Sequence, residues 1–290
     1  MINPYYYYIL YSSTDFFAVL VNMKRIESRN NPTIKNITAL RDNRTRRKEH
    51  LFYFEGVHLL EEYLRSGNVP EMLFVREDVI ERYSVLIQKA NCEVYEVTES
   101  VYDKLTEEKA PQGIFTVSRF LDNIVFVDDE VLDGLPERIE GNSIMLCDLQ
   151  DTGNVGTVIR TSAAMGCDVI LCGNCADIYS SKTVRATMGA MFMNGVYICP
   201  SAESAINSLR NGGKRVIATA LTDKAEILGE FDVLESDCFV IGNEGKGLKE
   251  SVISSCNFTT VIPMSGRTES LNAASASSMI LWEARRGKRF

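Results

Sequence analysis

The chain has 290 residues, of which 45% are hydrophobic and 24% are charged, and its formal net charge at pH 7 is -8. This length accommodates about two domains, each with a core of its own. The balance of apolar and charged residues excludes an intrinsically disordered chain. The net negative charge argues against a nucleic-acid partner unless positive charge is concentrated locally.

Residues 1–23 do not match a targeting or membrane element. A tyrosine run is followed by an apolar stretch that polar residues such as Asp15 interrupt. The segment lacks the basic start and the small-residue cleavage site of a signal peptide, and it is too broken for a membrane span. Met23, followed by two basic residues, resembles a natural start. We therefore expect residues 1–23 to be an extension without a fold of its own.

Alternating helical and strand patterns predict a compact α/β domain over residues 24–118. Helices are expected from residue 34 and over residues 57–64 and 79–90, and strands over residues 51–54, 71–75, 92–97 and 113–117. Residues 24–49 contain nine Lys or Arg and three Asp or Glu, which makes this region strongly basic. Such a cluster is typical of contact with a nucleic-acid backbone, and a plain solvated face is the alternative.

Residues 119–142 have the composition of an acidic linker. Between residues 122 and 140 there are seven Asp or Glu and one basic residue, and the segment contains Gly134 and Pro136. Its apolar residues show weak periodicity, and Gly and Pro favour turns. We expect this segment to join two folded domains.

A second α/β domain is expected over residues 143–290. Strands are predicted over residues 143–149, 168–172, 196–199, 215–221, 238–241 and 260–263, and helices over residues 154–165, 181–193, 201–209, 248–255 and 270–286. Strands that alternate with helices in this way are typical of an open parallel sheet covered by helices. Ligands bind such sheets outside the carboxyl ends of the strands, so the segments that follow strands are the candidates for chemistry.

The first such segment, residues 149–161, contains two glycines and Asn154 at the start of a helix. Backbone N–H groups at a helix start are free for a ligand. Arg160 follows within two helical turns, so that both side chains can border one pocket. A plain helix cap with a surface Arg is the alternative, and the phosphate-loop pattern is absent.

Two further segments combine glycines or small residues with polar side chains. Residues 240–248 contain three glycines within six positions around Glu244, which permits close backbone approach or positive φ. Residues 261–278 end a strand and begin a helix of small residues, which lets another backbone come near. A glycine-rich turn and a bland helix packing are the alternatives. The dinucleotide fingerprint is absent, which disfavours a nicotinamide-dependent dehydrogenase.

The eight cysteines lie mostly in apolar runs, which favours buried free thiols in a reducing compartment, the cytoplasm. Cys172 and Cys175 form a C-x-x-C pair. A zinc site usually needs a second pair or nearby histidines, and His50 and His58 are distant in sequence. We therefore expect no metal site.

Read together, the three segments resemble the signature motifs of the SpoU (TrmH-like) family of SPOUT RNA methyltransferases, over residues 143–286. Residues 28–35, 51–56 and 111–114 also resemble the substrate-binding domain that precedes the catalytic domain in rRNA members. Two departures are visible: Thr152 stands where the family usually has Pro, and the run after Asn272 is poorer in Val. Neither removes a catalytic position.

The resemblance implies an α/β fold whose C-terminal SPOUT domain has a parallel sheet and a deep trefoil knot, preceded by a smaller α/β RNA-binding domain. It implies a homodimer that shares an RNA site and uses S-adenosylmethionine to methylate a ribose 2′-hydroxyl, most favourably in large-subunit rRNA. The implied catalytic residues are Asn154, Arg160, Glu244, Ser270 and Asn272. The implied cofactor contacts are Thr219, Ala220, Leu221, Gly242, Ile262 and Leu271. The basic residues expected to grip RNA are Lys35, Arg41, Arg44, Arg46, Arg47 and Lys48.

In the family, the position of Arg160 is the proposed general base, yet an Arg side chain stays protonated in proteins. We interpret Arg160 as stabilising the developing 2′-oxyanion and the adjacent phosphate, with Asn154 and Ser270 positioning it and a phosphate oxygen or water taking the proton. The open alternatives are a tRNA 2′-O-methyltransferase, an antibiotic-resistance rRNA methylase, and a non-catalytic RNA-binding protein on the same fold. A thermal shift with S-adenosylmethionine discriminates the last of these.

Overall fold

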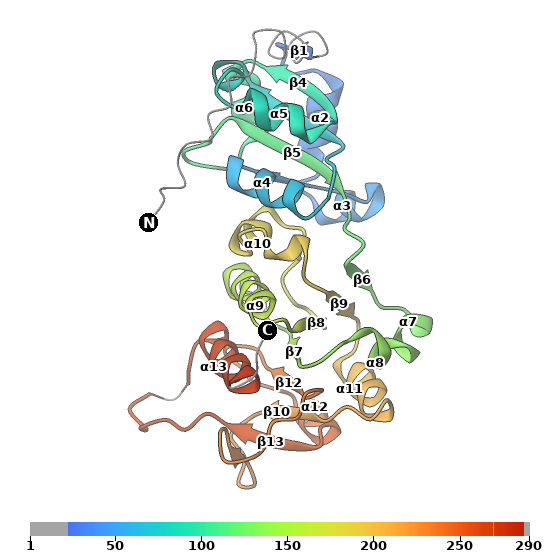
Figure 1. Ribbon diagram of the computed structural model, residues 1–290, viewed down its shortest axis with the longest axis vertical. Helices are drawn as coiled ribbons and strands as arrows, with labels where there is room; N and C mark the ends of the chain where they lie inside the picture. The colour runs from blue at the N-terminus through green and yellow to red at the C-terminus, as the bar shows by residue number, and fades with distance from the viewer. Residues whose placement is uncertain (1–22, 269, 287–290) are drawn as a thin grey trace, which may run out of the picture. The chain divides into compact units, whose positions relative to one another are not determined.

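The computed structural model describes residues 23–268 and 270–286 of the chain. They form two compact units, and the chain passes from one to the other between Arg119 and Phe120 (Figure 1). Residues 1–22, the greater part of the expected extension, lie outside the described residues. No helix within the described ranges is long and apolar enough to cross a membrane.

The first unit is built on a five-stranded mixed sheet with the strand order β1-β4-β3-β5-β2. Strands β1, β4 and β3 run parallel, and β5 is antiparallel to both β3 and β2. Its elements are β1 (Lys24–Ile26), α2 (Pro32–Ala39), α3 (Asn43–Glu49), β2 (Leu51–Glu55), α4 (Val57–Arg65), β3 (Met72–Arg76), η1 (Glu77–Val79), α5 (Ser84–Ala90), β4 (Glu93–Val97), α6 (Glu99–Leu105) and β5 (Ile114–Arg119).

Aromatic side chains from neighbouring strands form much of the core of this unit. Tyr53 on β2 stacks on Phe115 on β5 with ring centroids 5.0 Å apart, and Phe74 on β3 stacks on Tyr95 on β4 at 4.9 Å. These strands coincide with the four predicted apolar runs. The helix predicted over residues 79–90 is instead a 3-10 turn followed by the shorter α5, and α6 was not anticipated.

The second unit is built on an eight-stranded sheet with the order β11-β13-β10-β12-β7-β8-β9-β6, in which every neighbouring pair is parallel. Its elements are β6 (Ile124–Phe126), α7 (Asp129–Asp133), α8 (Leu135–Arg138), β7 (Ser143–Cys147), α9 (Thr152–Ala164), β8 (Asp168–Cys172), α10 (Ser181–Ala186), η2 (Ala190–Phe192), β9 (Val196–Cys199), α11 (Ala202–Asn211), β10 (Val216–Thr219), β11 (Glu226–Ile227), β12 (Cys238–Ile241), α12 (Glu250–Ser255), β13 (Phe258–Val261) and α13 (Ala273–Arg285). The predicted parallel α/β architecture is confirmed.

The segment expected to be an acidic linker is instead an integral part of the second unit. Its strand β6 pairs with β9 and extends the parallel sheet at one edge. The side chains of Leu135 and Ile139 are buried in the same core as β7 and β8. The acidic residues around them face solvent, so their charge concealed the short apolar contacts that fold this segment.

Helix caps explain where two helices of the second unit begin. Asp151 accepts a hydrogen bond from the backbone N–H of Asn154 at 2.7 Å, so α9 starts at Thr152, two residues before the prediction. Asn272 accepts hydrogen bonds from the N–H groups of Ala274 and Ser275, so α13 starts at Ala273, three residues after the prediction. The two loops before these helices are therefore held by polar side chains.

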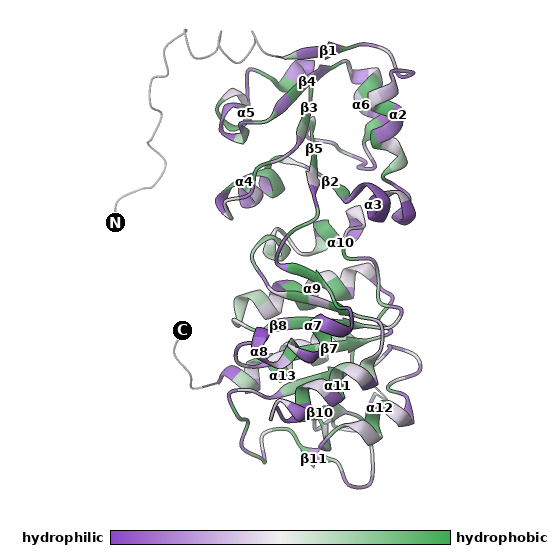
Figure 2. Ribbon diagram, turned by 90° about the vertical axis from the view of Figure 1, so that its right-hand side faces the viewer, coloured by the Kyte–Doolittle hydropathy of each residue, from purple (hydrophilic) through white to green (hydrophobic). Residues whose placement is uncertain are grey.

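The sheet of the second unit is apolar on its strands, as the green strands of Figure 2 illustrate.

Helix α9 approaches α10 closely because residue 156 is a glycine. A Cβ atom at Gly156 would lie 2.4 Å from the Cβ of Ala186 and 3.0 Å from the carbonyl oxygen of Thr183. This contact between the helices leaves no room for a side chain.

We expect Gly156→Ala to lower the free energy of unfolding by about 1–3 kcal/mol, the usual effect of overpacking a core. Chemical denaturation followed by circular dichroism measures it. Gly134→Ala is the matched control, because the nearest atom to its Cβ is 4.0 Å away. Equal stabilities for the two variants would show that α10 moves aside without strain.

Candidate functional site

Three polar side chains from distant parts of the sequence form a hydrogen-bonded chain beside the carboxyl ends of β7 and β12. The amide of Asn154 on α9 donates through Nδ2 to Oε1 of Glu244 at 3.0 Å. Its oxygen accepts from Nδ2 of Asn272 at 3.0 Å. The sheet pairs β7 with β12, and α13 contacts α9, which brings the three together. Three of the five expected catalytic residues are thus adjacent.

The orientation of this chain is determined at its Asn272 end. The side-chain oxygen of Asn272 accepts the two N–H groups at the start of α13, which leaves its NH₂ group to donate to Asn154. The Asn154 oxygen is therefore an acceptor, and its NH₂ group must face Glu244. The rigid start of one helix thus sets how the amide on another helix is presented.

A cavity of about 390 Å³ opens beside this chain, at the carboxyl ends of β10, β12 and β13. It is lined by five of the six expected cofactor contacts and by one expected catalytic residue: Thr219, Ala220, Leu221, Ile262, Leu271 and Ser270. Thr219 is fixed by a 2.6 Å hydrogen bond from its hydroxyl to the carbonyl oxygen of Val240. Most of the other lining residues are apolar, which suits a flat ring held between side chains.

The sixth expected contact, Gly242, shapes the cavity without lining it. A Cβ atom at Gly242 would lie 2.4 Å from the carbonyl carbon of Gly247 and 2.6 Å from the nitrogen of Leu248. The loop therefore folds back onto the end of β12. Asn243 holds it closed, because its Oδ1 accepts the N–H groups of Gly245 and Lys246 at 3.0 and 3.1 Å.

Arg160 is not brought into the hydrogen-bonded chain. It is exposed, and it lies six residues after Asn154, which places it about 120° away around the helix. The expectation that both side chains border one pocket stays a prediction. The helical periodicity of 3.6 residues, rather than proximity in sequence, decides which side chains share a face.

Sequence reasoning missed several residues that line the cavity. Lys246, Leu248, Ile253 and Met264 contribute to it from the loops after β12 and β13 and from α12. The residue types at these four positions do not by themselves indicate a ligand site. Their positions, just after the ends of parallel strands, are the signal that could have indicated them.

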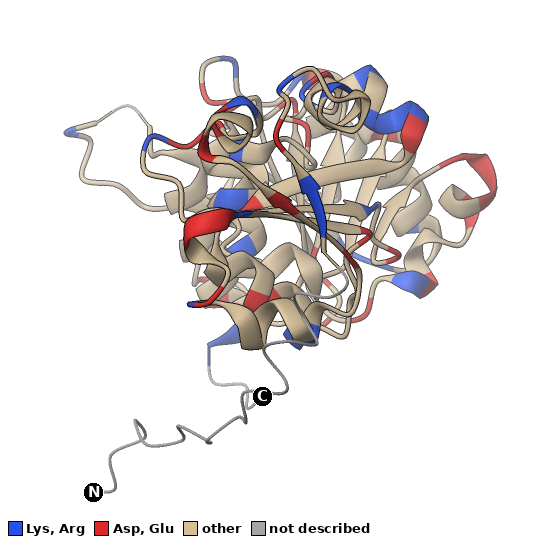
Figure 3. Cartoon of the chain, turned by 90° about the horizontal axis from the view of Figure 1, so that it is seen from above, with Lys and Arg blue, Asp and Glu red and all other residues tan. Residues whose placement is uncertain are grey.

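In the first unit, the basic residues expected to grip RNA separate into two groups. Lys35, Arg44, Arg47 and Lys48 are exposed, the last three on α3, which is hydrophilic along its length in Figure 2. Basic and acidic residues are interspersed along the cartoon of the chain (Figure 3). The local excess of basic residues is seen in the sequence of α3, which has four Lys or Arg and one Glu.

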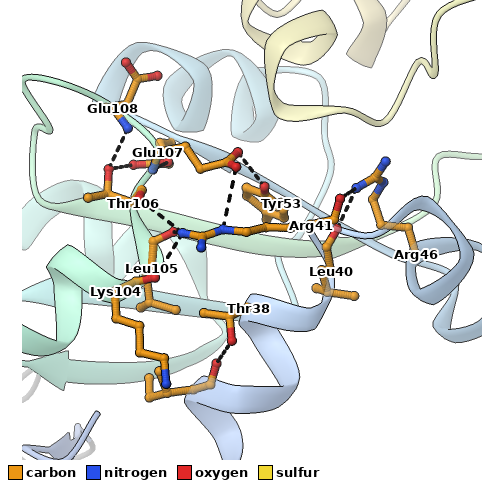
Figure 4. A network of polar contacts seen from close by, with 12 residues as sticks. Thr38, Leu40, Arg41, Arg46, Tyr53, Lys104, Leu105, Thr106, Glu107 and Glu108 are labelled. Carbon is orange, nitrogen blue, oxygen red and sulfur yellow. Dashed lines mark hydrogen bonds and ion pairs between the residues drawn. The ribbon is translucent and has the colours of Figure 1, made fainter.

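Arg46 is a correction to the expected RNA-binding set. Its side chain is buried, with 4% exposure, and Nη1 donates to the carbonyl oxygens of Leu40 and Arg41 at 2.6 and 2.8 Å (Figure 4). It satisfies the carbonyl groups that end α2. A buried guanidinium with these partners has a structural role and does not reach an RNA backbone.

Arg41 also serves the fold. Its Nη2 donates to the carbonyl oxygens that end α6, at Lys104, Leu105 and Thr106, over 3.0–3.2 Å. Its Nε lies 3.6 Å from a carboxylate oxygen of Glu107 (Figure 4). Its guanidinium holds a helix end, and because the side chain is also exposed, its expected contact with RNA stays a prediction.

The C-x-x-C pair has the properties of buried thiols. All eight cysteines are free. Burial raises the pKa of the Cys175 thiol to about 12, and the pKa of Cys172 is raised by hydrogen bonding with the thiols of Cys147 and Cys199 and by burial. No group of three or more His, Cys, Asp or Glu able to hold a metal ion occurs among the described residues.

Two known families match the chain over most of its length. The SpoU rRNA Methylase family matches residues 141–282, and the MRM3-like substrate binding domain matches residues 31–116. Among curated proteins, the chain is 29% identical over 267 residues to the 23S rRNA (guanosine(2553)-2′-O)-methyltransferase RlmP of Bacillus subtilis (strain 168), covering 91% of this chain and 100% of that protein.

Solved structures give the same result. An AdoMet-bound rRNA methyltransferase from Sinorhizobium meliloti superposes with a TM-score of 0.79 at 29% identity, over 93% of this chain and 100% of that chain. The SpoU methyltransferase AviRb from Streptomyces viridochromogenes superposes with a TM-score of 0.75 at 25% identity, over 88% and 97%. The parallel sheet and its cavity thus define a SPOUT-class methyltransferase. The chain belongs to the SpoU rRNA methylase family.

The two roles of the basic residues are separable by mutation. Arg46→Met should lower the free energy of unfolding by about 1.5–3 kcal/mol, because it removes charged hydrogen bonds to two carbonyl groups. Urea denaturation measures the change. Arg44→Met, at an exposed position of the same helix, should change stability by less than about 0.5 kcal/mol. Equal effects would mean that the buried hydrogen bonds of Arg46 contribute little.

Proposed function

We propose that the protein methylates a ribose 2′-hydroxyl in rRNA, with S-adenosylmethionine as the methyl donor. The observation that carries the proposal is the cavity beside the Asn154–Glu244–Asn272 chain, because it sets polar groups against the site of a donor molecule. Family membership supports both the reaction and the donor. The names of similar proteins favour rRNA over tRNA as the substrate.

The cavity at the carboxyl ends of β10, β12 and β13, hereafter the donor cavity, has a lining whose chemistry fits S-adenosylmethionine. Leu221, Leu248 and Leu271 offer apolar surface for an adenine ring, and backbone groups of the surrounding loops are available for its polar edges. When bound, S-adenosylmethionine supplies a methyl group activated by a positively charged sulfur. Thr219, Ala220 and Ile262 complete the lining on the strand side.

The task of the protein is to orient the ribose and stabilise charge as its hydroxyl attacks. The Asn154 amide has a second N–H that can donate to a ribose oxygen, and its orientation is determined by Asn272 and Glu244. Ser270 lines the cavity and offers a hydroxyl group there. Arg160 stabilises the developing oxyanion and the adjacent phosphate, and a phosphate oxygen or water takes the proton.

We infer that Arg160 acts in the site of a second subunit of a homodimer. It is exposed on α9, on a face different from that of Asn154. The neighbouring helix α13 exposes Met279 and Trp282, with 46% and 59% of their surface accessible, which is apolar area suited to burial against a second copy. Closed two-fold symmetry then brings the same faces of both subunits together.

We infer a trefoil knot in the loops that follow β12 and β13, with residues 24–118 as the RNA-binding domain and the second unit, from Phe120 on, as the catalytic domain. Lys35, Arg44, Arg47 and Lys48 contact the RNA backbone. An rRNA substrate and free buried thiols support a cytoplasmic location.

Asn154→Ala should reduce kcat by about 100-fold or more, because a misplaced ribose loses the attack geometry. Binding of S-adenosylmethionine, measured by calorimetry, should be unchanged, since Asn154 does not line the donor cavity. Asn211→Ala, at the exposed end of α11, is the matched control. Full methyl transfer to rRNA by the Asn154→Ala variant would show that Asn154 has no part in the mechanism.

Mixing two inactive variants tests the shared site. Asn154→Ala and Arg160→Ala homodimers should each be inactive, and subunit exchange should restore roughly a quarter of the normal rate, because half of the mixed population carries one intact site. Methyl transfer to rRNA is measured before and after exchange. No recovery, with dimers confirmed by light scattering, would show that Arg160 acts within its own subunit.

A further inference from the structure

A second cavity, of about 340 Å³, lies at the carboxyl ends of β7, β8 and β12 and is distinct from the donor cavity. Polar side chains line it: Asp148, Gln150, Asn174, Asn243, Lys246 and Lys249. The sequence motifs did not indicate it, because Asp148, Asn174 and Lys249 lie outside the three signature segments.

The topology of the sheet explains why a cavity forms at this position. Strands β8 and β9 lie on one side of β7, and strands β12, β10 and β13 lie on the other. The segments that follow β7 and β12 therefore lead away in opposite directions and leave a crevice between them. In open parallel sheets this switch point is the usual ligand site. Here the donor cavity lies further along, at β10, β12 and β13, so the crevice is available to another ligand.

The crevice is continuous with the reacting site. Lys246 and Gly247 line both this cavity and the donor cavity. Gln150 immediately precedes the cap of α9, the helix that carries Asn154, and Asn243 immediately precedes Glu244. The two loops that present the catalytic polar chain thus also form the walls of the crevice. A nucleotide whose ribose is held at Asn154 has this cavity beside it.

The acidic group of the crevice is held in a defined orientation. Asp148 has a left-handed backbone, with φ at 56°, which non-glycine residues seldom adopt. One oxygen of its carboxylate accepts the N–H of Asn174 at 2.8 Å, and the other lies 3.2 Å from Nζ of Lys249. The Asn174 N–H holds the pKa of Asp148 below its usual value, so the carboxylate stays charged. Each oxygen retains a further lone pair for a ligand.

The lining carries one carboxylate and two ammonium groups, of which Lys249 lies against Asp148. A carboxylate accepts two adjacent N–H groups, and among the bases guanine offers such a pair on its Watson–Crick edge. The side chains of Asn174 and Gln150 are exposed at the cavity and can donate or accept, and Lys246 offers a donor for a carbonyl oxygen of the base. The groups present thus match the donors and acceptors of guanine.

We propose that this crevice binds the base of the nucleotide that is methylated, and that Asp148 selects guanine there. The proposal rests on the proposed ribose methyltransferase activity, because it names the base attached to that ribose. Asp148 accepts from the guanine N–H groups, and Asn174 and Gln150 border the ring. The donor cavity and the base cavity then flank the loop of Gly247, with the ribose between them.

The first experiment maps ribose methylation on rRNA treated with the purified protein and S-adenosylmethionine. Methylation at a guanosine is expected. Methylation at any other nucleotide would overturn the base assignment and leave the proposed function standing. Treated rRNA with no ribose methylation would instead defeat the proposed function itself.

The second experiment measures kcat/KM on a synthetic RNA hairpin around the mapped nucleotide, carrying either guanosine or inosine there. Inosine lacks the 2-amino group. The normal enzyme should prefer guanosine by about tenfold or more, the discrimination that a bidentate base contact provides. Asp148→Asn should methylate both hairpins at similar, reduced rates. Retention of the guanosine preference in this variant would overturn the role of Asp148.

Two further variants separate recognition from folding. Asn174→Ala keeps the backbone N–H that holds Asp148, and it should raise KM for the guanosine hairpin several-fold with kcat and S-adenosylmethionine binding unchanged. Asn211→Ala, an exposed Asn away from both cavities, should behave as the normal enzyme. If Asp148→Asn does not fold, Asn174→Ala decides, because an unchanged KM there contradicts the base cavity.

Discussion

The functional geometry of the second unit depends on how tightly the loop after β12 folds back on that strand. Only a glycine fits at position 242, because the carbonyl carbon of Gly247 would lie 2.4 Å from a Cβ atom. The closed loop contains Glu244, and it sets Leu248 against the donor cavity and Lys249 against the second cavity. One backbone contact therefore positions the Glu244 side chain and a wall of each of the two cavities.

Helices α9 and α13 connect to this loop through side-chain hydrogen bonds. Helix α13 begins at a cap whose spare amide hydrogens hold Asn154, and Asn154 in turn holds Glu244. Each hydrogen bond orients the next side chain, starting from the backbone N–H groups at the start of α13. A reaction that needs alignment more than strong acid or base chemistry is well served by such a chain. The exposed Arg160 supplies positive charge from a different face.

The charge pattern along this sequence predicts structure correctly only when the burial of each side chain is also known. Arg44 and Arg46 are two positions apart, yet the first is exposed and the second is enclosed by carbonyl groups that end α2. The acidic segment before β7 similarly carries short apolar stretches that complete the sheet and its core. In both regions the charge pattern indicated solvent or RNA, whereas single inward-facing positions determine the structure.

The sequence by itself determined the parallel α/β class, the aromatic strands of the first unit, and the three segments that carry the site, because strand periodicity and glycine spacing are local properties. The resemblance also indicated six residues that line the donor cavity. Only the tertiary structure decided that Asn154, Glu244 and Asn272 join while Arg160 points elsewhere, that Arg46 is buried, and that a second cavity exists at Asp148. The hydrogen-bonded chain through Asn154 depends on strand order and helix packing, because it joins residues 90 and 118 positions apart. The burial of Arg46 depends on how α3 turns back onto the end of α2, which residue types do not specify.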